Sequence, residues 1–396
     1  IAVGKEILTG KTVNTNLKDI ALKLKQIGID VNRSFVIDDI KEEYYKTLDS
    51  ATEDFIIFTG GLGPTIDDIT REVVYEYFNV ETYVDENMLA YIKGIFDKAG
   101  FKMKDTNNKQ ALLPKDCIIL HNDLGTAPGV YFEVSGKHIV LFPGPPHEMN
   151  PMMDKVQDIM REKLNIKLVS AGFKLVGTGE SYMEDALKGF YQLYPTVNVA
   201  PYANVGEIKY IFTSESKEDL KSCMKDFRER FDRFIFGGLE DTLESVVVKK
   251  LSDTKKTVSF AESCTGGLVA STVVNVSGSS SVFNESFVTY SNESKMKYLN
   301  VSKSVLDQFG AVSNECAFEM VQGLHKATNC DYGISVTGIA GPTGGTEEKP
   351  VGLVYFGIYN EGDIKTHRRV FNGNRMMVRK RATIHALNLL RGVLDE

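Results

Sequence analysis

The sequence predicts an α/β protein: two three-layer α/β domains with mostly parallel sheets, joined by a small α+β module. Residues 1–165 and 241–396 alternate short apolar runs with amphipathic helical segments, which is typical of parallel strands joined by crossover helices. Residues 166–240 read as strand, helix, strand, strand, helix and strand. At 396 residues with 42% hydrophobic residues, the chain is long enough for three units that each bury a core.

The first domain opens with a predicted helix. Apolar residues recur at helical spacing from Leu17 to Ile27, and Gly28 follows as a natural helix stop. The elements predicted next are a strand over 29–37, a helix over 41–51, a short buried strand over 54–59, a helix over about 67–78, and a helix that follows the turn at 143–146 and ends near residue 164.

The middle module and the third domain are predicted from the same signals. The tight turn Asn204-Val205-Gly206 separates two strand-like runs, and a charged amphipathic helix covers 217–232. Gly237 and Gly238 mark a linker. The elements predicted in the third domain are short buried strands over 258–261 and 332–336, a longer strand over 351–359, and a last helix over 374–394.

Composition excludes several classes of protein. With a net charge of −7 and a pI near 5.6, the chain is not expected to bind nucleic acid directly. No apolar run approaches the roughly 20 residues of a membrane helix, so no membrane partner is expected. The five cysteines lack CxxC spacing, and no signal peptide is visible, which together indicate a reducing cytoplasm. A homodimer is the expected assembly because symmetric dimers are the commonest.

A glycine-rich turn follows the strand predicted at 54–59. Glycines let a backbone approach a phosphate, the N-terminus of the next helix points N–H groups at it, and adjacent carboxylates can hold a divalent cation. The structural alternative is a capping box with Thr65 as N-cap and Asp68 at N3, but capping needs no glycine. The residues predicted here for nucleotide binding or metal are Thr59, Gly60, Gly61, Gly63, Thr65, Asp67 and Asp68.

Other polar residues are predicted near the same edge of the sheet, where open parallel sheets bind ligands. Segments 4–6 and 14–16, together with Asp38, all stand at predicted strand or helix ends. Asn16 is a candidate nucleotide-binding residue, although as a residue at a helix start it is better explained as an N-cap.

The third domain has a second strand–turn–helix, built on a serine. Residues 258–261 run into Glu262-Ser263-Cys264-Thr265-Gly266-Gly267, and an apolar helix follows. At a helix N-terminus, the dipole would stabilise an alkoxide or oxyanion formed at Ser263. The alternatives are that Ser263 or Thr265 is only an N-cap, or that Cys264 is the nucleophile, since a helix start lowers a thiol pKa.

A serine nucleophile needs a base, and the segment 287–295 offers Tyr290 and Lys295. A lysine made less basic by burial can take the serine proton, as in Ser–Lys variants of the catalytic triad. Taken singly, Lys295 is more often a solvated lysine and Tyr290 a packed strand residue, so only their combination carries weight.

Two further features complete the predicted site of the third domain. Thr337 and Gly338 follow a strand, and Lys349 ends a glycine-rich loop; both stretches could line a nucleotide site or be simple turns. Arg375 and Arg379 extend the apolar stripe of the last helix, and inward arginines usually have an anionic partner. A ligand phosphate and an internal carboxylate are about equally good candidates for that partner.

These motifs resemble the competence/damage-inducible protein A (CinA) family along nearly the whole chain. The motifs that carry the resemblance are TGGLGPT with Asp67 and Asp68, the upstream GxE and NTN, PGPPHEM with Pro143 and Gly144, GTGES, AESCTGG, VTYSNESK, GAVS, VTGIAGPTGGTEEKPVG and NRMMVRKRA. The first domain is similar to molybdopterin-binding domains, and the middle module is expected to be KH-like. One departure is Lys5, where many family members carry Asp.

The resemblance implies a function for each large domain. For the third, it implies a nicotinamide-nucleotide amidohydrolase that converts nicotinamide mononucleotide (NMN) to nicotinic acid mononucleotide and ammonia without a metal, with Ser263, Tyr290 and Lys295 catalytic. For the first, it implies cleavage of ADP-ribose with a divalent metal such as Mg²⁺ at Asp68, with Asp67 beside it. The substrate-binding residues expected in the third domain are Cys264, Thr265, Gly266, Gly267, Thr337, Gly338, Lys349, Arg375 and Arg379.

The sequence therefore predicts a cytoplasmic enzyme of pyridine-nucleotide metabolism with two activities. The alternative for the first domain is a pterin- or nucleotide-binding module without catalysis. A competence factor that acts on DNA fits neither the acidic pI nor the lack of a basic stripe with aromatic residues.

Overall fold

The computed structural model describes residues 1–395 and contains two compact units, divided after Val169. The first unit contains the first predicted domain, 1–165, and the start of the predicted middle module, and the second unit contains the rest of that module together with the third domain. Glu396, included in the predicted third domain, lies outside the described residues. Among the helices of residues 1–395, none is both long enough and apolar enough to cross a membrane.

A six-stranded mixed sheet forms the middle of the first unit. Three of its strand pairs are parallel and two are antiparallel. In spatial order the strands are β2 (Val36–Ile37), β1 (Ala2–Val3), β3 (Phe55–Thr59), β8 (Lys137–Phe142), β7 (Gly129–Val134) and β6 (Ile118–Leu120). A separate antiparallel pair is formed by β4 (Thr82–Val84) and β5 (Leu112–Pro114).

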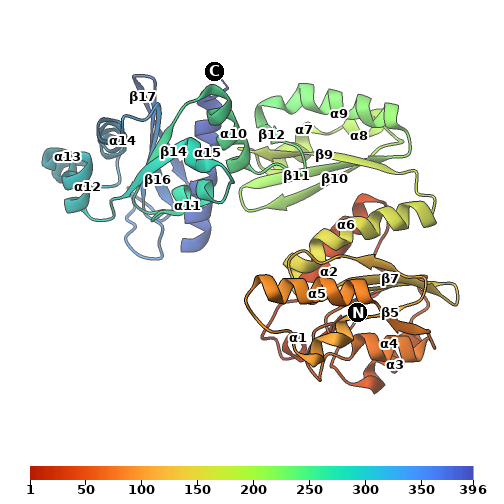
Figure 1. Ribbon diagram of the computed structural model, residues 1–396. Coiled ribbons are helices and arrows are strands. Elements are labelled where there is room, and N and C mark those ends of the chain that lie inside the picture. The colour runs from red at the N-terminus through yellow and green to blue at the C-terminus, as the bar shows by residue number, and fades with distance from the viewer. Residues whose placement is uncertain (396) are drawn as a thin grey trace. The chain divides into compact units, whose positions relative to one another are not determined.

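Helices cover both faces of this sheet, which confirms the three-layer prediction (Figure 1). One core contains Ile20, Val140 and Met153, between α2 and α6 and the sheet. The other contains Tyr44 and Val74, between α3 to α5 and the opposite face. The helices of the unit are α1 (Lys5–Leu8), α2 (Thr15–Gln26), α3 (Lys41–Ser50), α4 (Thr70–Tyr77), α5 (Glu86–Lys98), the 3₁₀ helix η1 (Asp105–Ala111) and α6 (Pro146–Lys163).

Two element predictions for this unit are wrong in extent. The strand expected over 29–37 is reduced to Val36–Ile37, because its neighbour β1 pairs with only these two residues. The helix expected from about Asp67 begins at Thr70, whose N–H donates to the Gly61 carbonyl. The turn after β3 is therefore longer than the sequence indicated.

The middle module has the predicted order of elements, with one short extra α-helix and a 3₁₀ helix. Its four-stranded sheet has the order β10–β11–β9–β12, with antiparallel β10–β11 and β9–β12 pairs. The elements are β9 (Val169–Val176), α7 (Glu180–Ala186), α8 (Phe190–Leu193), β10 (Asn198–Asn204), β11 (Glu207–Ser214), α9 (Lys217–Phe231), the 3₁₀ helix η2 (Asp232–Phe234) and β12 (Ile235–Gly237).

The third domain is built on a five-stranded sheet of order β14–β13–β15–β16–β17. The pairs of β13 with β14 and β15 are parallel, whereas β15–β16 and β16–β17 are antiparallel, so this sheet is only half parallel. A loop without a helix joins β15 to β16, and such a connection permits antiparallel pairing. The strands are β13 (Val258–Glu262), β14 (Phe283–Val288), β15 (Tyr332–Gly338), β16 (Leu353–Asn360) and β17 (Asp363–Val370).

Helices again cover both faces of the sheet (Figure 1). Val247, Val273 and Ala386 pack with one face, and Leu299 and Met320 with the other. The helices are α10 (Leu243–Thr254), α11 (Leu268–Val274), the 3₁₀ helix η3 (Ser279–Ser281), α12 (Asn292–Leu299), α13 (Lys303–Phe309), α14 (Asn314–Thr328) and α15 (Arg375–Val393).

The middle module packs against α15 of the third domain. The Arg391 guanidinium donates to the carbonyl oxygens of Arg233 at 3.0 Å and Ile235 at 3.4 Å. The Ile384 side chain packs closely against Gly206 in the β10–β11 turn. A Cβ added to Gly206 would come within 2.9 Å of that side chain. These contacts join the two parts into one unit.

Candidate active site

A buried serine–lysine pair lies at the carboxyl end of the central strand of the third domain. Ser263 follows β13 directly, and Lys295 lies in α12, thirty-two residues later. The Lys295 Nζ is 3.1 Å from the Ser263 Oγ. Lys295 is 1% exposed and Ser263 is 8% exposed, so the pair is shielded from bulk water while the hydroxyl keeps an accessible edge.

Burial favours the neutral form of the Lys295 amine. Besides the Ser263 hydroxyl, Nζ lies 2.8 Å from the Thr289 carbonyl and 3.3 Å from that of Tyr290. Carbonyl oxygens only accept, so a neutral amine would donate its two N–H groups to them and turn its lone pair to the hydroxyl. No ion pair joins Lys295 to a carboxylate in residues 1–395, and burial lowers the pKa of Lys295 from its usual value. The arrangement suits a general base.

The turn between β13 and α11 holds Ser263 by its backbone. The Ser263 N–H donates to the Val336 carbonyl on β15, and its carbonyl accepts from Gly266 N–H at 3.1 Å. Gly266 and Gly267 have φ of 60° and 90°, a left-handed region in which residues other than glycine are strained. Two consecutive glycines are therefore needed to reverse the chain into α11.

The predicted position of Ser263 at a helix N-terminus is wrong. The helix α11 begins at Leu268, five residues after Ser263, and its N-cap is Gly267, so neither Ser263 nor Thr265 caps it. The buried carboxylate of Glu262 caps it instead, accepting from the N–H groups of Gly267, Val269 and Ala270. Because these donors are occupied, the end of α11 cannot serve an oxyanion.

Other donors in the turn remain free. In the described part of the chain, no carbonyl or side-chain oxygen accepts from the N–H of Cys264 or Thr265. The Thr265 hydroxyl is also buried and has no partner there. The two N–H groups next to the nucleophile are thus the available oxyanion donors.

Cys264, the rival nucleophile, is poorly placed to ionise. It is 5% exposed, and burial raises the pKa of its thiol to about 12, with the nearby Glu262 charge acting in the same direction. A protonated buried thiol is a weak nucleophile.

Tyr290 lies near the pair in a different manner from that expected. Its carbonyl faces the Lys295 amine, but the residue is 61% exposed, and its phenol accepts from Arg375 Nη2 at 2.9 Å. Arg375 also donates to the Gly341 carbonyl at 2.8 Å. The structure therefore places the phenol with Arg375 rather than with Ser263 and Lys295.

Arg379 directly contacts the turn between β13 and α11, residues 263–267, which we call the serine turn. Its guanidinium donates twice to the Thr265 carbonyl, at 2.6 and 3.2 Å. The expected alternative, an internal carboxylate partner, is wrong: within residues 1–395 neither Arg375 nor Arg379 forms an ion pair with Asp or Glu. Neither guanidinium group therefore has a compensating carboxylate among the described residues.

The remaining residues expected in this site make structural contacts. The Thr337 hydroxyl is buried and donates to the Ala311 carbonyl at 2.6 Å. A Cβ on Gly338 would come within 2.7 Å of the Leu353 carbonyl, so the close β15–β16 approach explains this glycine. The Lys349 amine donates to the Phe309 carbonyl at 2.6 Å.

In the first unit, an acidic cavity of about 390 Å³ lies beside the glycine-rich turn. Its five carboxylates come from four separate segments of the chain. Burial, with Asp68 as the strongest charged neighbour, raises the pKa of Asp39 to about 6. The residues in its wall that the sequence predicted are Gly60, Gly61, Gly63, Asp67, Asp68, Pro143 and Gly144, and its acidic residues are Glu6, Asp39, Asp67, Asp68 and Glu148.

The glycines of this turn have a packing reason of their own. A Cβ on Gly60 would come within 2.3 Å of the Val3 carbonyl, and one on Gly61 within 2.1 Å of the Thr70 hydroxyl. A Cβ on Gly63 would meet the Asp68 carboxylate at 2.4 Å. The inference from glycines to phosphate binding is correspondingly weaker.

Asp67 and Asp68 are engaged by Thr65. The Thr65 hydroxyl lies 2.5 Å from an oxygen of each carboxylate, and its one proton can be donated to either; the Thr65 N–H donates to Asp68 at 2.9 Å. The capping box expected here is wrong because α4 begins only at Thr70. In residues 1–395, no group of three or more His, Cys, Asp or Glu side chains is placed so that it could hold a metal ion.

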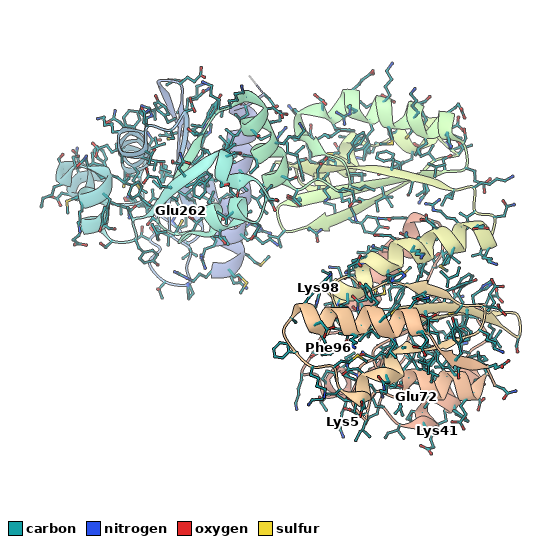
Figure 2. The ribbon with its side chains drawn as sticks, viewed as in Figure 1. Lys5, Lys41, Glu72, Phe96, Lys98 and Glu262 are labelled. Carbon is teal, nitrogen blue, oxygen red and sulfur yellow. The ribbon has the colours of Figure 1, made fainter. Side chains whose placement is uncertain are left out.

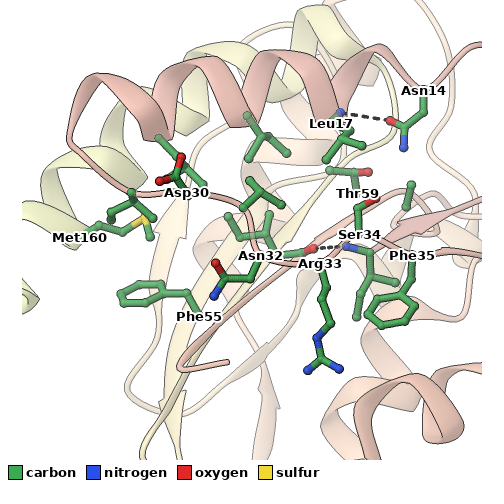
Figure 3. A pocket seen from close by; sticks show the side chains of 17 residues that line it. Asn14, Leu17, Asp30, Asn32, Arg33, Ser34, Phe35, Phe55, Thr59 and Met160 are labelled. Carbon is green, nitrogen blue, oxygen red and sulfur yellow. Dashed lines mark hydrogen bonds between the residues drawn. The ribbon is translucent and has the colours of Figure 1, made fainter. Parts of the chain in front are cut away.

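Asn16 does not cap its helix, contrary to the favoured interpretation. Asn14 is the N-cap of α2 and accepts from Leu17 N–H at 3.1 Å, as Figure 3 shows. Asn16 is buried instead, and its amide donates to the Gly144 carbonyl at 2.8 Å. Its Oδ1 has no partner among the described residues and lies beside a cavity that Thr59 also lines.

A second pocket of the first unit, drawn in Figure 3, lies next to β1 and has a volume of about 120 Å³. Of the predicted site residues, Thr59 lines it. Its other walls are largely apolar, with Leu17, Phe35 and Phe55 among them, and none of the carboxylates at the glycine-rich turn borders it.

Sequence reasoning missed Glu262 and Asp39. A Glu that ends an otherwise apolar strand just before a glycine-rich turn was a usable signal for Glu262. Asp39 had a weaker signal, since only its neighbour Asp38 was singled out at the end of the predicted strand.

Comparisons with known proteins identify the family of each large domain. Residues 1–162 match the family described as the probable molybdopterin binding domain, and residues 240–394 match the CinA C-terminal domain. A Clostridium perfringens protein named as competence-damage inducible is 45% identical over all of this chain and 98% of its own length. CinA-like proteins of Kosmotoga olearia and Dictyoglomus turgidum are 41% and 40% identical, over 98% of their lengths.

Solved structures match parts of the chain. The competence/damage inducible protein CihA of Agrobacterium tumefaciens is 37% identical, with a TM-score of 0.38, over 39% of this chain and 94% of that one. A molybdopterin biosynthesis protein of Mycobacterium abscessus is 15% identical, with a TM-score of 0.29, over 41% of this chain and 90% of that one. The full-length sequence relatives place both large domains in a single chain, and this protein belongs to the competence-damage inducible (CinA) family.

Proposed function

We propose that the third domain hydrolyses the carboxamide of nicotinamide mononucleotide to nicotinic acid mononucleotide and ammonia. The observation that carries the proposal is the 3.1 Å contact between the Lys295 amine and the Ser263 hydroxyl inside a buried site. Family membership supports a hydrolase-type role, and the substrate is the one that the sequence resemblance implies.

Acylation begins with attack of the Ser263 Oγ on the carboxamide carbon. The hydroxyl proton passes to the Lys295 amine, whose lone pair faces it. The tetrahedral oxyanion is held by the N–H groups of Cys264 and Thr265. The C–N bond then breaks, and the amide nitrogen takes the proton from Lys295 and leaves as ammonia, so that Ser263 carries an ester of the nicotinic acid group.

Deacylation runs through the same groups. Lys295, neutral again, takes a proton from water, and the hydroxide attacks the ester carbon. Collapse of the second tetrahedral species returns the proton to the Ser263 oxygen and releases nicotinic acid mononucleotide. One water is consumed and one ammonia formed, and no metal takes part in the proposed steps.

Two arginines at the start of α15 are the proposed holders of the 5′-phosphate. Arg375 and Arg379 have no carboxylate partner in residues 1–395, and a guanidinium suits bidentate contact with phosphate. The Tyr290 phenol accepts a hydrogen bond from Arg375, and we assign to it the orientation of this arginine. The resemblance also implies that Tyr290 is a catalytic residue.

Ammonia release from NMN tests this proposal directly. The wild type should release one ammonia per nicotinic acid mononucleotide, and Ser263→Ala should lose the activity. Equal rates for the two proteins would remove Ser263 from the reaction, and loss of activity in Cys264→Ala alone would move it to the thiol.

For the first unit, we propose that the acidic cavity binds a nucleotide diphosphate of the ADP-ribose type and cleaves it with a divalent metal. The cavity holds five carboxylates, which is the observation that favours this activity. Asp68 and Asp67 are the residues nearest the glycine-rich turn that could contact such an ion, although the described residues do not form a complete ligand set. A binding module without catalysis is the rival.

A metal-titrated assay of the full chain separates the two. Release of AMP from ADP-ribose that requires Mg²⁺ or Mn²⁺ and is lost in Asp68→Asn supports cleavage. Binding of ADP-ribose without turnover in any of these metals supports the binding module.

A further inference from the structure

Glu262 is a fully buried carboxylate immediately before the nucleophile. It is the last residue of β13, 0% exposed, and Figure 2 marks its position in the third domain. It forms no ion pair with a Lys, Arg or His of residues 1–395. A buried charge without compensation is costly, so its hydrogen bonds must replace a counter-ion.

Three backbone donors supply that compensation. Oε2 accepts from Gly267 at 2.9 Å and from Val269 at 3.1 Å, and Oε1 accepts from Ala270 at 2.9 Å. These N–H groups lie at the start of α11, where helix geometry leaves donors without partners and where the dipole favours a negative charge. One side chain thus satisfies three of the N–H donors at the start of the helix.

The same three bonds tie the far end of the serine turn to the end of β13. At the near end, Ser263 N–H is fixed to Val336, and Thr289 N–H donates to the Glu262 carbonyl at 2.8 Å. Arg379 holds the middle of the turn through the Thr265 carbonyl. Every backbone N–H in the turn is thereby occupied except those of Cys264 and Thr265.

We propose that Glu262 is a positioning residue for the hydrolase reaction: its carboxylate fixes the turn so that the Cys264 and Thr265 N–H groups face the oxyanion formed at Ser263. The inference rests on the proposed function of the third domain. It assigns to Glu262 no contact with the substrate and no proton transfer. Its effect is on transition-state stabilisation, because oxyanion donors act on the tetrahedral species more than on the bound amide.

The test compares Glu262→Gln and Glu262→Ala with the wild type. Glutamine has the same shape but replaces one acceptor oxygen with an NH₂ that faces N–H donors, whereas alanine removes every acceptor. Loss of one oxyanion donor costs about 10²–10³ in kcat in a known hydrolase. We expect kcat for NMN to fall by about 10²-fold in Glu262→Gln and further in Glu262→Ala, with KM within about threefold of the wild type.

Glu319→Gln is the matched control. Glu319 also holds the start of a helix, accepting from the Ser302 N–H at 2.7 Å and hydroxyl at 3.1 Å just before α13, but it does not contact the serine turn. A purely structural effect predicts that Glu262→Gln and Glu319→Gln both lower the unfolding temperature and both keep kcat. Positioning predicts that only Glu262→Gln lowers kcat.

A third variant keeps the test valid if substitutions at Glu262 prevent folding. Ala270→Pro removes the N–H that donates to Oε1, at a position in the first turn of α11 where proline is tolerated. It should lower kcat without changing KM. Unchanged kcat in Ala270→Pro, or in folded Glu262→Gln, overturns the proposal, as does a raised KM with unchanged kcat.

A fluorophosphonate probe separates this inference from the choice of substrate. The Ser263 Oγ–P bond forms as the P–F bond breaks, fluoride leaves with the electron pair, and the hydroxyl proton passes to Lys295. Intact mass should show fast labelling of the wild type, none of Ser263→Ala, and labelling of Glu262→Gln slowed by at least tenfold. Wild type that labels but does not hydrolyse NMN refutes the substrate, while equal labelling of Glu262→Gln refutes the role of Glu262.

Discussion

Replacement of Lys295 by methionine tests the base most directly. Methionine fills a similar volume but has no amine, so the Ser263 hydroxyl loses the neighbour at 3.1 Å that takes its proton. General-base catalysis contributes typically about 10²–10⁴ in rate, or about 2.7–5.4 kcal/mol at 1.36 kcal/mol per decade. We expect kcat for ammonia release from NMN, followed by a coupled ammonia assay, to fall by that factor in Lys295→Met.

The pH profile adds a signature that a packing defect would not produce. Burial lowers the pKa of Lys295, so the neutral base is populated below the usual range of a lysine. In the wild type, log kcat should rise with unit slope up to the lowered pKa and then level off, and Lys295→Met should lack this limb. A Lys295→Met variant that keeps more than a tenth of the wild-type rate, or that keeps the limb, would refute the assignment.

The same pKa shift has a consequence for stability. The unfolded state binds this proton up to the usual lysine pKa of 10.5, whereas the folded state releases it at lower pH. Between the lowered pKa and 10.5 the unfolded state therefore binds more protons, and wild-type stability should rise with pH relative to Lys295→Met. Urea unfolding of the two proteins across this range measures the difference.

Three further outcomes are expected. Cys264→Ala should keep kcat within about threefold, because burial holds the thiol pKa at about 12 and the group stays protonated; steady-state ammonia release checks this. Burial lowers the pKa of His385 to about 4 from 6.5, so stability is lost as pH falls through this window, and His385→Phe should raise the unfolding temperature at pH 5 more than at pH 8. The pKa of Asp39 is raised to about 6 from 3.8, so stability is lost as pH rises from 3.8 to 6. Because the group is partly solvated, we expect Asp39→Asn to raise the free energy of unfolding in urea by only about 1–2 kcal/mol at pH 7.5, and almost not at all at pH 4.

Most of the fold could be predicted because hydrophobic periodicity reports burial locally. The strands at 54–59, 258–261 and 332–336 and the last helix all lie within a few residues of the observed elements. The strand over 29–37 failed because its length depends on β1, a partner that periodicity within the segment does not describe.

The direction of strand pairing in the third domain is a second feature that the prediction missed. Alternating strands and helices indicated mostly parallel pairing, but β15, β16 and β17 pair antiparallel. The signal was present in the chain: no helical pattern separates β15 from β16, and only Glu361 and Gly362 separate β16 from β17. A connection of two residues permits only a hairpin.

Part of the candidate site could be predicted from residue types alone. Ser263 and Lys295 were expected to meet, and they lie 3.1 Å apart. The sequence could not show which backbone N–H groups of the turn are occupied by Glu262 and which remain free for a ligand. Whether a helix N-terminus serves a ligand or a buried Glu262 depends on a side-chain rotamer and on where α11 begins.

The seam between the middle module and α15 bears on how the protein can be cut into pieces for study. A fragment that starts near residue 241 would open Ile384 to solvent and withdraw the two carbonyl groups that receive the Arg391 guanidinium. A fragment that starts at residue 170 preserves both contacts. For crystallography or fragment screening on the serine site, a fragment should therefore start at residue 170 and not at Gly237 and Gly238, where the composition indicates a linker.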